Sequence, residues 1–164
     1  MLQIRRRFGR GAVVAAASAA VVASAAGIAV ASASVPHITT ATTLRLEARG
    51  GTSTFVNVRH LSRPAVGDEV ILAQPVYSAA HPSQLVGHGV VTVIFVAPPR
   101  VSQDHATLVL KNGQIDAAGV EASNPFQLAV TGGTGQYQNA RGQATVKLLP
   151  GPGNKALITV SLLP

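Results

Sequence analysis

Cysteine and tryptophan are both absent from this chain of 164 residues, and only 12% of its residues are charged. Without cysteine the fold has no disulfide, and neither thiolate chemistry nor a cysteine-ligated zinc is available. Aromatic residues make up only 4% of the chain, so an interior must be built mainly from Val, Leu, Ile and Ala. The fold therefore depends on one hydrophobic core, supported by subunit contacts.

The first 33 residues have the anatomy of a secretory signal peptide. Arginines among residues 5–10 form a positive head, residues 11–30 are an unbroken Ala- and Val-rich run, and residues 31–33 are small. The head also partly matches a twin-arginine export signal. We expect residues 1–33 to be removed and the mature protein to be secreted. The alternative is that the leader stays uncleaved and anchors the protein, because the run is about long enough to span a bilayer. We expect no other contact with a membrane.

Removal of the leader changes the charge of the protein. The whole chain has 13 Lys+Arg and 6 Asp+Glu. Four of the arginines and none of the acids lie in the leader, so the mature chain has nine basic and six acidic residues and a net charge of +3. The nearest approach to a basic cluster is Arg45, Arg49, Arg59 and Arg63, which are spread over two expected strands and a loop. We interpret them as solvated surface residues and expect no nucleic-acid partner.

The mature chain is predicted to be all-β. Residues 34–42 form a flexible N-terminal segment, and residues 43–164 form one domain in which short strand patterns recur without helical periodicity. We expect strands at residues 43–48, 53–58, 69–76, 86–96, 105–110, 114–118, 126–131, 142–148 and 155–162. Strands of this length and spacing favour an antiparallel barrel or sandwich. A barrel lined with aliphatic side chains leaves room for a ligand.

The expected strand at residues 86–96 is apolar on both faces. Val91, Val93 and Phe95 lie on one face, and Val90 and Ile94 lie on the other. A strand with one solvated face alternates apolar and polar residues, so both faces of this strand are expected to leave water. The inner face would line the barrel, and a partner subunit would cover the outer face. We therefore expect a homo-oligomer with cyclic symmetry.

Several familiar catalytic motifs are missing. The sequence has no Gly-x-Ser-x-Gly elbow, no lysine that would turn its glycine cluster into a phosphate loop, and no metal-ligand spacing among its five histidines. We therefore expect no metal and no other cofactor.

Four polar residues in or beside apolar strands are candidates for catalysis: Glu47, Gln74, Tyr77 and Arg141. If Glu47 is buried, desolvation would raise its pKa and let it act as an acid or base; the alternative is a surface carboxylate paired with an arginine. Arg141 would stabilise an anionic oxygen, or alternatively would bond backbone carbonyls near the turn that precedes it.

That turn belongs to the most distinctive stretch of the chain, residues 126–148. An apolar strand pattern enters a glycine-dense turn at Gly132, Gly133 and Gly135, and a second alternating strand leaves it. Glycine accepts backbone angles that other residues avoid, so the cluster indicates a tight reversal. Tyr137 and Asn139 follow in the same turn, and we group all five with Val91, Val93 and Phe95 as pocket or turn residues.

Residues 132–142 resemble the Gly-Gly-Thr-Gly-x-Tyr/Phe-x-x-Ala-Arg-Gly segment of the allene oxide cyclase and dirigent barrels. Residues 67–77 are similar to the Gly-Asp-x-Val…Asn-x-x-Tyr strand of the cyclases, and residues 85–87 and 113–119 resemble further strand and hairpin segments of these proteins. The likeness extends from residue 67 to the C-terminus and suggests an exported, bacterial-style relative.

The resemblance implies an eight-stranded antiparallel barrel, commonly a trimer, with an apolar pocket. The cyclases close a ring in an unsaturated fatty-acid epoxide with a glutamate and an ordered water, whereas dirigent proteins orient phenoxy radicals or cyclise quinone methides with acidic residues and an arginine. By this likeness Glu47 corresponds to the first-strand glutamate, Gln74 stands where the cyclases have an asparagine near the water, and Arg141 follows the dirigent pattern.

Three functions remain open at this point. The first is a secreted, isomerase-like cyclase or stereo-directing protein acting on an apolar small molecule. The second is an extracellular carrier that binds such a ligand without catalysis, which outward-facing Glu47 and Arg141 would favour. The third is a structural surface protein whose barrel contains no cavity.

Overall fold

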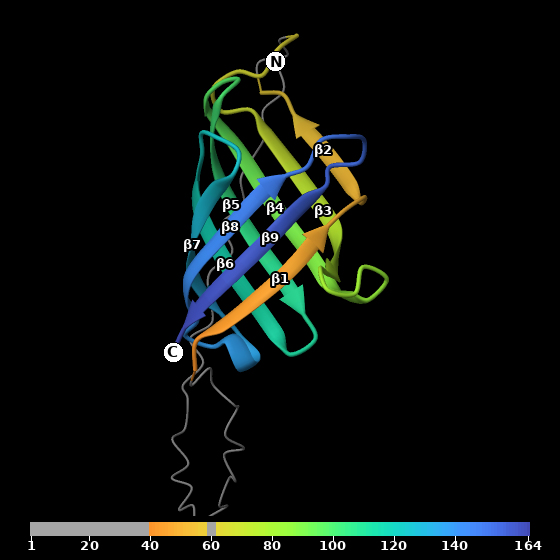
Figure 1. Cartoon of the computed structure of the whole chain (residues 1–164). Helices are drawn as coiled ribbons and strands as arrows, with labels where there is room; N and C mark the ends of the chain where they lie inside the picture. Colours follow the sequence, from red (N-terminus) through yellow and green to blue (C-terminus); the bar gives the residue numbers. More distant parts are fainter. Residues whose placement is uncertain (1–39, 59–61) are drawn as a thin grey trace, which may run out of the picture. The chain divides into compact units, whose positions relative to one another are not determined.

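The computed structural model describes residues 40–58 and 62–164, which form nine β-strands and one short 3-10 helix (Figure 1). The elements are β1 (Thr42–Ala48), β2 (Thr52–Val56), β3 (Glu69–Ser78), β4 (Leu85–Ala97), β5 (Val101–Leu110), β6 (Gly113–Glu121), β7 (Phe126–Gly133), η1 (Gly135–Tyr137), β8 (Arg141–Leu148) and β9 (Ala156–Leu163). Each strand expected from the sequence is present, with ends shifted by a few residues. The predicted leader and most of the predicted 34–42 segment lie outside the described residues.

The strands form one antiparallel sheet that closes into a barrel. Neighbouring strands follow the order β1-β9-β8-β7-β6-β5-β4-β3-β2, and an additional pairing of β1 with β3 closes the sheet. β1 pairs with β9 along its whole length but with β3 only from Leu46 to Ala48, while β2 pairs with the first half of β3. β1 and β2 thus occupy one position in the circuit, and the nine strands make an eight-stranded barrel, as predicted.

The change from β1 to β2 depends on two glycines. Gly50 and Gly51 have φ angles of +70° and +84°, in the left-handed region that side chains disfavour. A Cβ at Gly51 would also overlap the backbone carbonyl of Ala73 on β3. Through this turn the chain passes from β1, which pairs with the end of β3, to β2, which pairs with the first half of β3.

One end of the barrel is filled by side chains. Tyr137 and Ala140, in and just after η1, are each 6% exposed and pack in the core cluster with Ile115, Val130 and Leu162. Figure 1 shows η1 at the opposite end of the barrel from the β8–β9 loop. We call the η1 end the closed end, and the end that carries the β8–β9 loop the open end.

A buried aspartate organises the β2–β3 connection at the open end. Asp68 is fully buried, and its carboxylate accepts hydrogen bonds of 2.8 Å from the backbone N–H groups of Val58 and Ala65. Its backbone carbonyl accepts a hydrogen bond from Phe95 N on β4. The Gly67-Asp68 pair singled out in the sequence therefore ties this connection to the barrel wall.

Candidate functional site: a cavity in the barrel

The barrel encloses a cavity of about 360 Å³ between the packed core and the open end. Its wall is mainly aliphatic, with Phe126 as its aromatic member among the described residues; the wall includes Leu72, Val91, Val93, Ala106, Leu128 and Ile158. Exposed residues of the β8–β9 loop, among them Gly151 and Asn154, line its outer part, so the cavity reaches solvent there. Its volume lies within the range of about 300–1,000 Å³ that is typical of small-molecule sites.

Inward-facing small side chains create this space. Ala48, Ala106, Ala117, Ala144 and Ala156 all contribute to the cavity wall. Successive residues of a strand point to opposite faces, so these alanines occupy positions that larger side chains would use to fill the interior. The scarcity of aromatic residues noted in the sequence has the expected consequence in the structure.

Gln74 contributes an amide to the cavity wall from the middle of β3. The side chain is 8% exposed, and its Nε2 donates hydrogen bonds to Gly50 O at 3.2 Å and to Asn154 O at 2.6 Å. It thereby ties the β1–β2 turn to the β8–β9 loop. Both amide hydrogens are used in these bonds, so Oε1 is the atom that Gln74 can offer to a ligand.

Two carboxyl groups face the same cavity from neighbouring strands. Asp104 on β5 is 2% exposed, and Glu121 ends β6 directly opposite Ser102. Ser102 Oγ donates a 2.8 Å hydrogen bond to Asp104 Oδ1, and a further side-chain hydrogen bond joins Asp104 to Glu121. Ser102, Asp104 and Glu121 are called the acid cluster below.

The environment of the acid cluster raises the pKa of both carboxyl groups. Burial raises the pKa of Asp104 above its usual range, against the opposing effects of its hydrogen bonds to Ser102 and Glu121 and of the nearby His105. Burial also raises the pKa of Glu121, and the charge of Asp104 and the hydrogen bond to it act in the same direction. Burial is therefore the main cause of the raised pKa in both carboxyl groups, and each of them influences the titration of the other.

The structure places the sequence-predicted candidates on two different faces of the barrel wall. Gln74, Val91 and Val93 line the cavity. Phe95 lies two residues further along β4 and is not part of the cavity wall, because the strand has by then reached the open end beside Asp68. Glu47 and Tyr77 are register partners on the outer face of β1 and β3.

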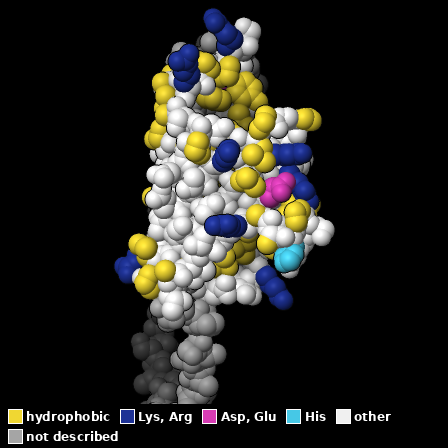
Figure 2. All heavy atoms as spheres, in the orientation of Figure 1, with side chains coloured by type: hydrophobic (Ala, Val, Ile, Leu, Met, Phe, Trp, Pro, Cys, Tyr) yellow, Lys and Arg dark blue, Asp and Glu magenta, His cyan; other side chains and the backbone are white. Residues whose placement is uncertain are grey.

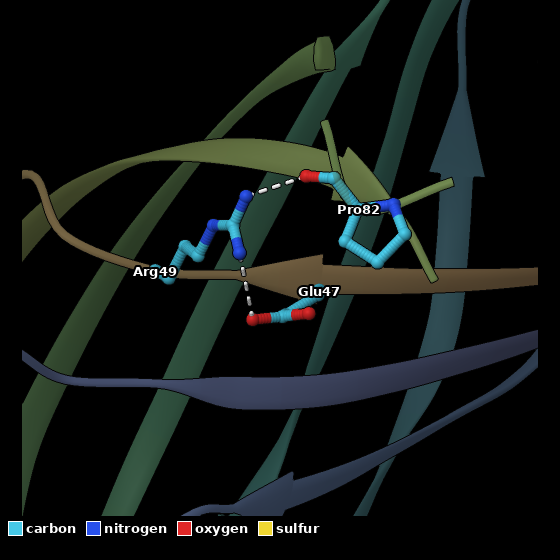
Figure 3. A network of polar contacts seen from close by, with 3 residues as sticks. All are labelled: Glu47, Arg49 and Pro82. Atoms are coloured by element: carbon cyan, nitrogen blue, oxygen red, sulfur yellow. Dashed lines mark hydrogen bonds and ion pairs between the residues drawn. The ribbon is translucent and has the colours of Figure 1, made fainter. Parts of the chain in front are cut away.

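Glu47 and Tyr77 belong to a polar network on the outside of the barrel. The guanidinium of Arg49 lies 3.5 Å from the Glu47 carboxylate and 4.2 Å from the centre of the Tyr77 ring. It also donates a hydrogen bond to Pro82 O in the β3–β4 connection (Figure 3). This is the surface pairing that the sequence left open as the alternative for Glu47, and it pins β1 to the β3–β4 loop.

Arg141 is likewise placed outside the cavity. It is exposed at the start of β8, and its Nη2 donates a 2.7 Å hydrogen bond to the backbone carbonyl of Pro164. Arg141 therefore bonds a backbone carbonyl, as in the alternative left open by the sequence, although the carbonyl belongs to the C-terminal residue rather than to the turn. Catalytic roles for Glu47, Tyr77 and Arg141 remain predictions, and the structure does not bring these residues together with Gln74.

The glycine-dense turn lies at the closed end and has a packing role. A Cβ on Gly133 would lie 2.5 Å from Tyr137 O and still closer to Gln114 O, whereas a Cβ on Gly132 would meet nothing within 4 Å. Gly135 and Asn139 have positive φ angles, as the tight reversal requires. The turn presses η1 against the β5–β6 hairpin and closes the barrel, so these members of the predicted pocket-or-turn group are turn residues.

Sequence reasoning missed the acid cluster. The expected strands began at residue 105 and ended at residue 118, which left Asp104 and Glu121 outside them. The available signal was the alternation Ser102, Asp104, Ala106, Leu108, in which two polar residues extend the apolar face of β5. Among the residues that the structure describes, no group of three His, Asp or Glu side chains is arranged to hold a metal ion.

Comparisons with known proteins place this geometry in a structural class. No protein-family model matches the chain. No curated protein sequence matches it significantly. A solved pyocyanin demethylase structure superposes with a TM-score of 0.63 at 25% identity, covering 74% of this chain and 99% of the other.

Two further solved structures share the barrel at lower sequence identity. The pterocarpan synthase dirigent protein PsPTS1 gives a TM-score of 0.65 at 16% identity, covering 76% of this chain and 96% of its own. AbnU, described as an exo-specific intermolecular Diels-Alderase, gives 0.57 at 17% identity, covering 75% and 98%. The chain therefore shares its barrel fold with solved dirigent and Diels-Alderase proteins, which confirms the fold that the resemblance in the sequence implied.

Proposed function

We propose that this protein binds an apolar small molecule inside the barrel and steers its cyclisation or its stereochemistry. The observation that carries the proposal is the cavity of about 360 Å³, whose apolar wall is interrupted by Gln74 and the acid cluster. The dirigent and Diels-Alderase barrels with the same fold support it, because their names describe reactions of this kind.

The cavity would act mainly by confinement. An apolar wall restricts a flexible ligand to few conformers and excludes water, which lowers the entropic part of the barrier to ring closure. The acid cluster adds two carboxyl groups whose pKa values are raised by burial, so one can donate a proton to a developing anionic oxygen while the other stabilises developing positive charge. Gln74 orients the ligand through its free Oε1.

Binding without catalysis is the second candidate. The outward placement of Glu47 and Arg141 favours it, since neither residue reaches a ligand in the cavity. Each buried methylene contributes about 0.8 kcal/mol, so an apolar chain can bind usefully without a reactive group. The cavity argues against the third candidate, a barrel with a solid interior.

We also propose export and self-association. The leader motivates export, and exposed apolar side chains on the outside of the barrel motivate an oligomer: Ile71, Val90, Val109 and Val120 are each at least 38% exposed. Hydrophobic side chains also gather at the end that carries the β2–β3 and β4–β5 connections, on the face drawn in Figure 2. A trimer of the mature chain is the form expected from the resemblance.

Native mass spectrometry of the mature protein, purified from its own culture, tests these proposals together. The spectrum before and after mild denaturation gives the mass of the processed chain, the number of subunits and the mass of any copurified ligand. A released apolar small molecule supports the proposed function, and its turnover by the purified protein separates catalysis from carriage. An empty protein that also rejects a panel of fatty acids and phenolics contradicts it.

A further inference from the structure

We infer that the cavity selects apolar ligands that carry a positive charge or a hydrogen-bond donor, and that it disfavours carboxylates. This inference rests on the proposed function, because it assumes that the cavity is where the ligand binds. It is drawn from the polar groups of the cavity wall, and it narrows the ligand from any apolar small molecule to one that also carries a positive charge or a hydrogen-bond donor.

The first observation that supports the inference is the presence of two carboxyl groups in the cavity wall. Asp104 and Glu121 line the cavity from neighbouring strands, so two carboxyl groups face its interior. A buried carboxyl group favours a ligand that brings a positive charge or a hydrogen-bond donor. The other charged residue of the wall is Lys155, which is exposed in the β8–β9 loop and belongs to the mouth of the cavity. Solvent screens a charge at that position far more than a charge in the interior.

The second argument is independent of charge and concerns Gln74. Its two N–H bonds are directed to Gly50 O and Asn154 O in the backbone, so the amide cannot donate to a ligand without losing one of these bonds. Gln74 lines the cavity, and Oε1 is the acceptor that its side chain can present to a ligand. A ligand that donates a hydrogen bond therefore matches Gln74 better than a ligand that only accepts one.

The interior therefore presents two carboxyl groups and the Gln74 amide inside an apolar wall. A ligand ammonium, iminium, amide N–H or phenol O–H satisfies these groups, whereas a ligand carboxylate places a second negative charge beside the first. Like charges in a low-dielectric site repel strongly, so a ligand carboxylate is disfavoured beside Asp104 and Glu121. The polar groups thus discriminate among ligands of the same apolar shape.

Three amphiphiles with one hydrocarbon chain test the inference: dodecylamine, dodecanol and dodecanoate. Each is titrated at neutral pH, below its micelle concentration, against the mature protein loaded with the neutral fluorescent probe N-phenyl-1-naphthylamine. The inference predicts that dodecylammonium displaces the probe at a concentration roughly tenfold or more below that of dodecanoate, with dodecanol between them. Equal or tighter displacement by dodecanoate overturns the inference.

Variants assign the discrimination to the acid cluster. The double variant Asp104→Asn/Glu121→Gln removes the charge with little change of shape, and the preference is expected to fall below roughly twofold. The single variant Glu121→Gln keeps the Asp104 anion and a donor to it, so its preference should persist. Glu47→Gln removes a carboxylate from the outer face and serves as the matched control. A full preference in the double variant, or its loss in Glu47→Gln, overturns the assignment.

The failures of the two proposals are distinguishable. If the neutral probe does not enter the barrel and no amphiphile binds, the proposed function fails and the inference fails with it. If the probe and all three amphiphiles bind equally, the inference fails and the proposed function stands. Should the double variant not fold, the comparison of the amphiphiles on the unmodified protein and on Glu121→Gln still decides the outcome.

Discussion

Filling the cavity should strengthen the empty protein and weaken ligand binding at the same time. Ala106 lies on the cavity wall in β5, and its side chain is only partly covered although it points into the barrel. Ala106→Leu adds three carbons to this space. Each buried carbon contributes about 0.8 kcal/mol, so the substitution takes about 2.4 kcal/mol of contact away from a ligand that previously occupied the same volume.

The expected effect on binding is a Kd about fiftyfold higher, because 1.4 kcal/mol corresponds to a factor of about ten. The expected effect on stability has the opposite sign. The same three carbons leave water when the empty barrel folds, which stabilises it by up to about 2 kcal/mol and raises Tm by roughly 5–10 °C. Fluorescence titration with N-phenyl-1-naphthylamine measures the first effect, and thermal unfolding followed by circular dichroism measures the second.

Ala129→Leu is the matched control for this experiment. Ala129 lies on the exposed outer face of β7, so the same substitution there should leave the Kd of the probe nearly unchanged. The reasoning is refuted if Ala106→Leu folds stably and binds the probe as well as the unmodified protein does. It is also refuted if Ala129→Leu weakens binding as much as Ala106→Leu.

Three further predictions follow from the placement of individual residues. The raised pKa of Glu121 means that the folded state binds the Glu121 proton more tightly than the unfolded state does, so this contribution to the free energy of unfolding is complete below the ordinary value of 4.5 and is lost as pH rises through the raised pKa. Urea unfolding across pH should therefore show a smaller loss of stability in Glu121→Gln than in the unmodified protein. Identical pH profiles would contradict the pKa shift. In the same assay Gly133→Ala should lower the free energy of unfolding by about 2–3 kcal/mol, because the added Cβ would overlap backbone oxygens. Gly132→Ala should change it by less than about 0.5 kcal/mol, because a Cβ there meets nothing within 4 Å. Equal effects of the two substitutions would contradict the packing role of the turn. Glu47→Gln and Arg141→Leu should leave the Kd of the probe within about twofold, since neither residue lines the cavity, and a large loss would restore their predicted roles.

The barrel could be predicted from sequence because its strands follow local rules. Apolar alternation and the glycine cluster each depend on neighbours a few residues away, and all nine expected strands are present. Closure was accessible only through the family resemblance. The pairing of β1 and β2 with different halves of β3 depends on Gly50 and Gly51, and nothing in the local pattern distinguishes this turn from an ordinary hairpin.

The candidate site was harder to predict because face assignment needs register as well as alternation. Glu47 sits between apolar neighbours, and that pattern fits a carboxylate on either side of a barrel wall. Asp104 and Glu121 lie at strand ends, where polar residues are ordinarily solvated. Pairing of β5 with β6 brings them together on one wall of the cavity. The two positions are 17 residues apart, and the sequence pattern does not determine the register that joins them.

The central claim is that the interior of the barrel, and not its outer surface, receives the ligand. The most direct test is a methyl-resolved NMR titration of the mature protein, labelled at Val, Leu and Ile, with N-phenyl-1-naphthylamine. We predict shifts in the methyl signals of Val91, Val93 and Ile158, which line the cavity, and none in those of Val90 on β4 and Val109 on β5, which point outward. Shifts confined to the outward-facing methyl groups would contradict the claim.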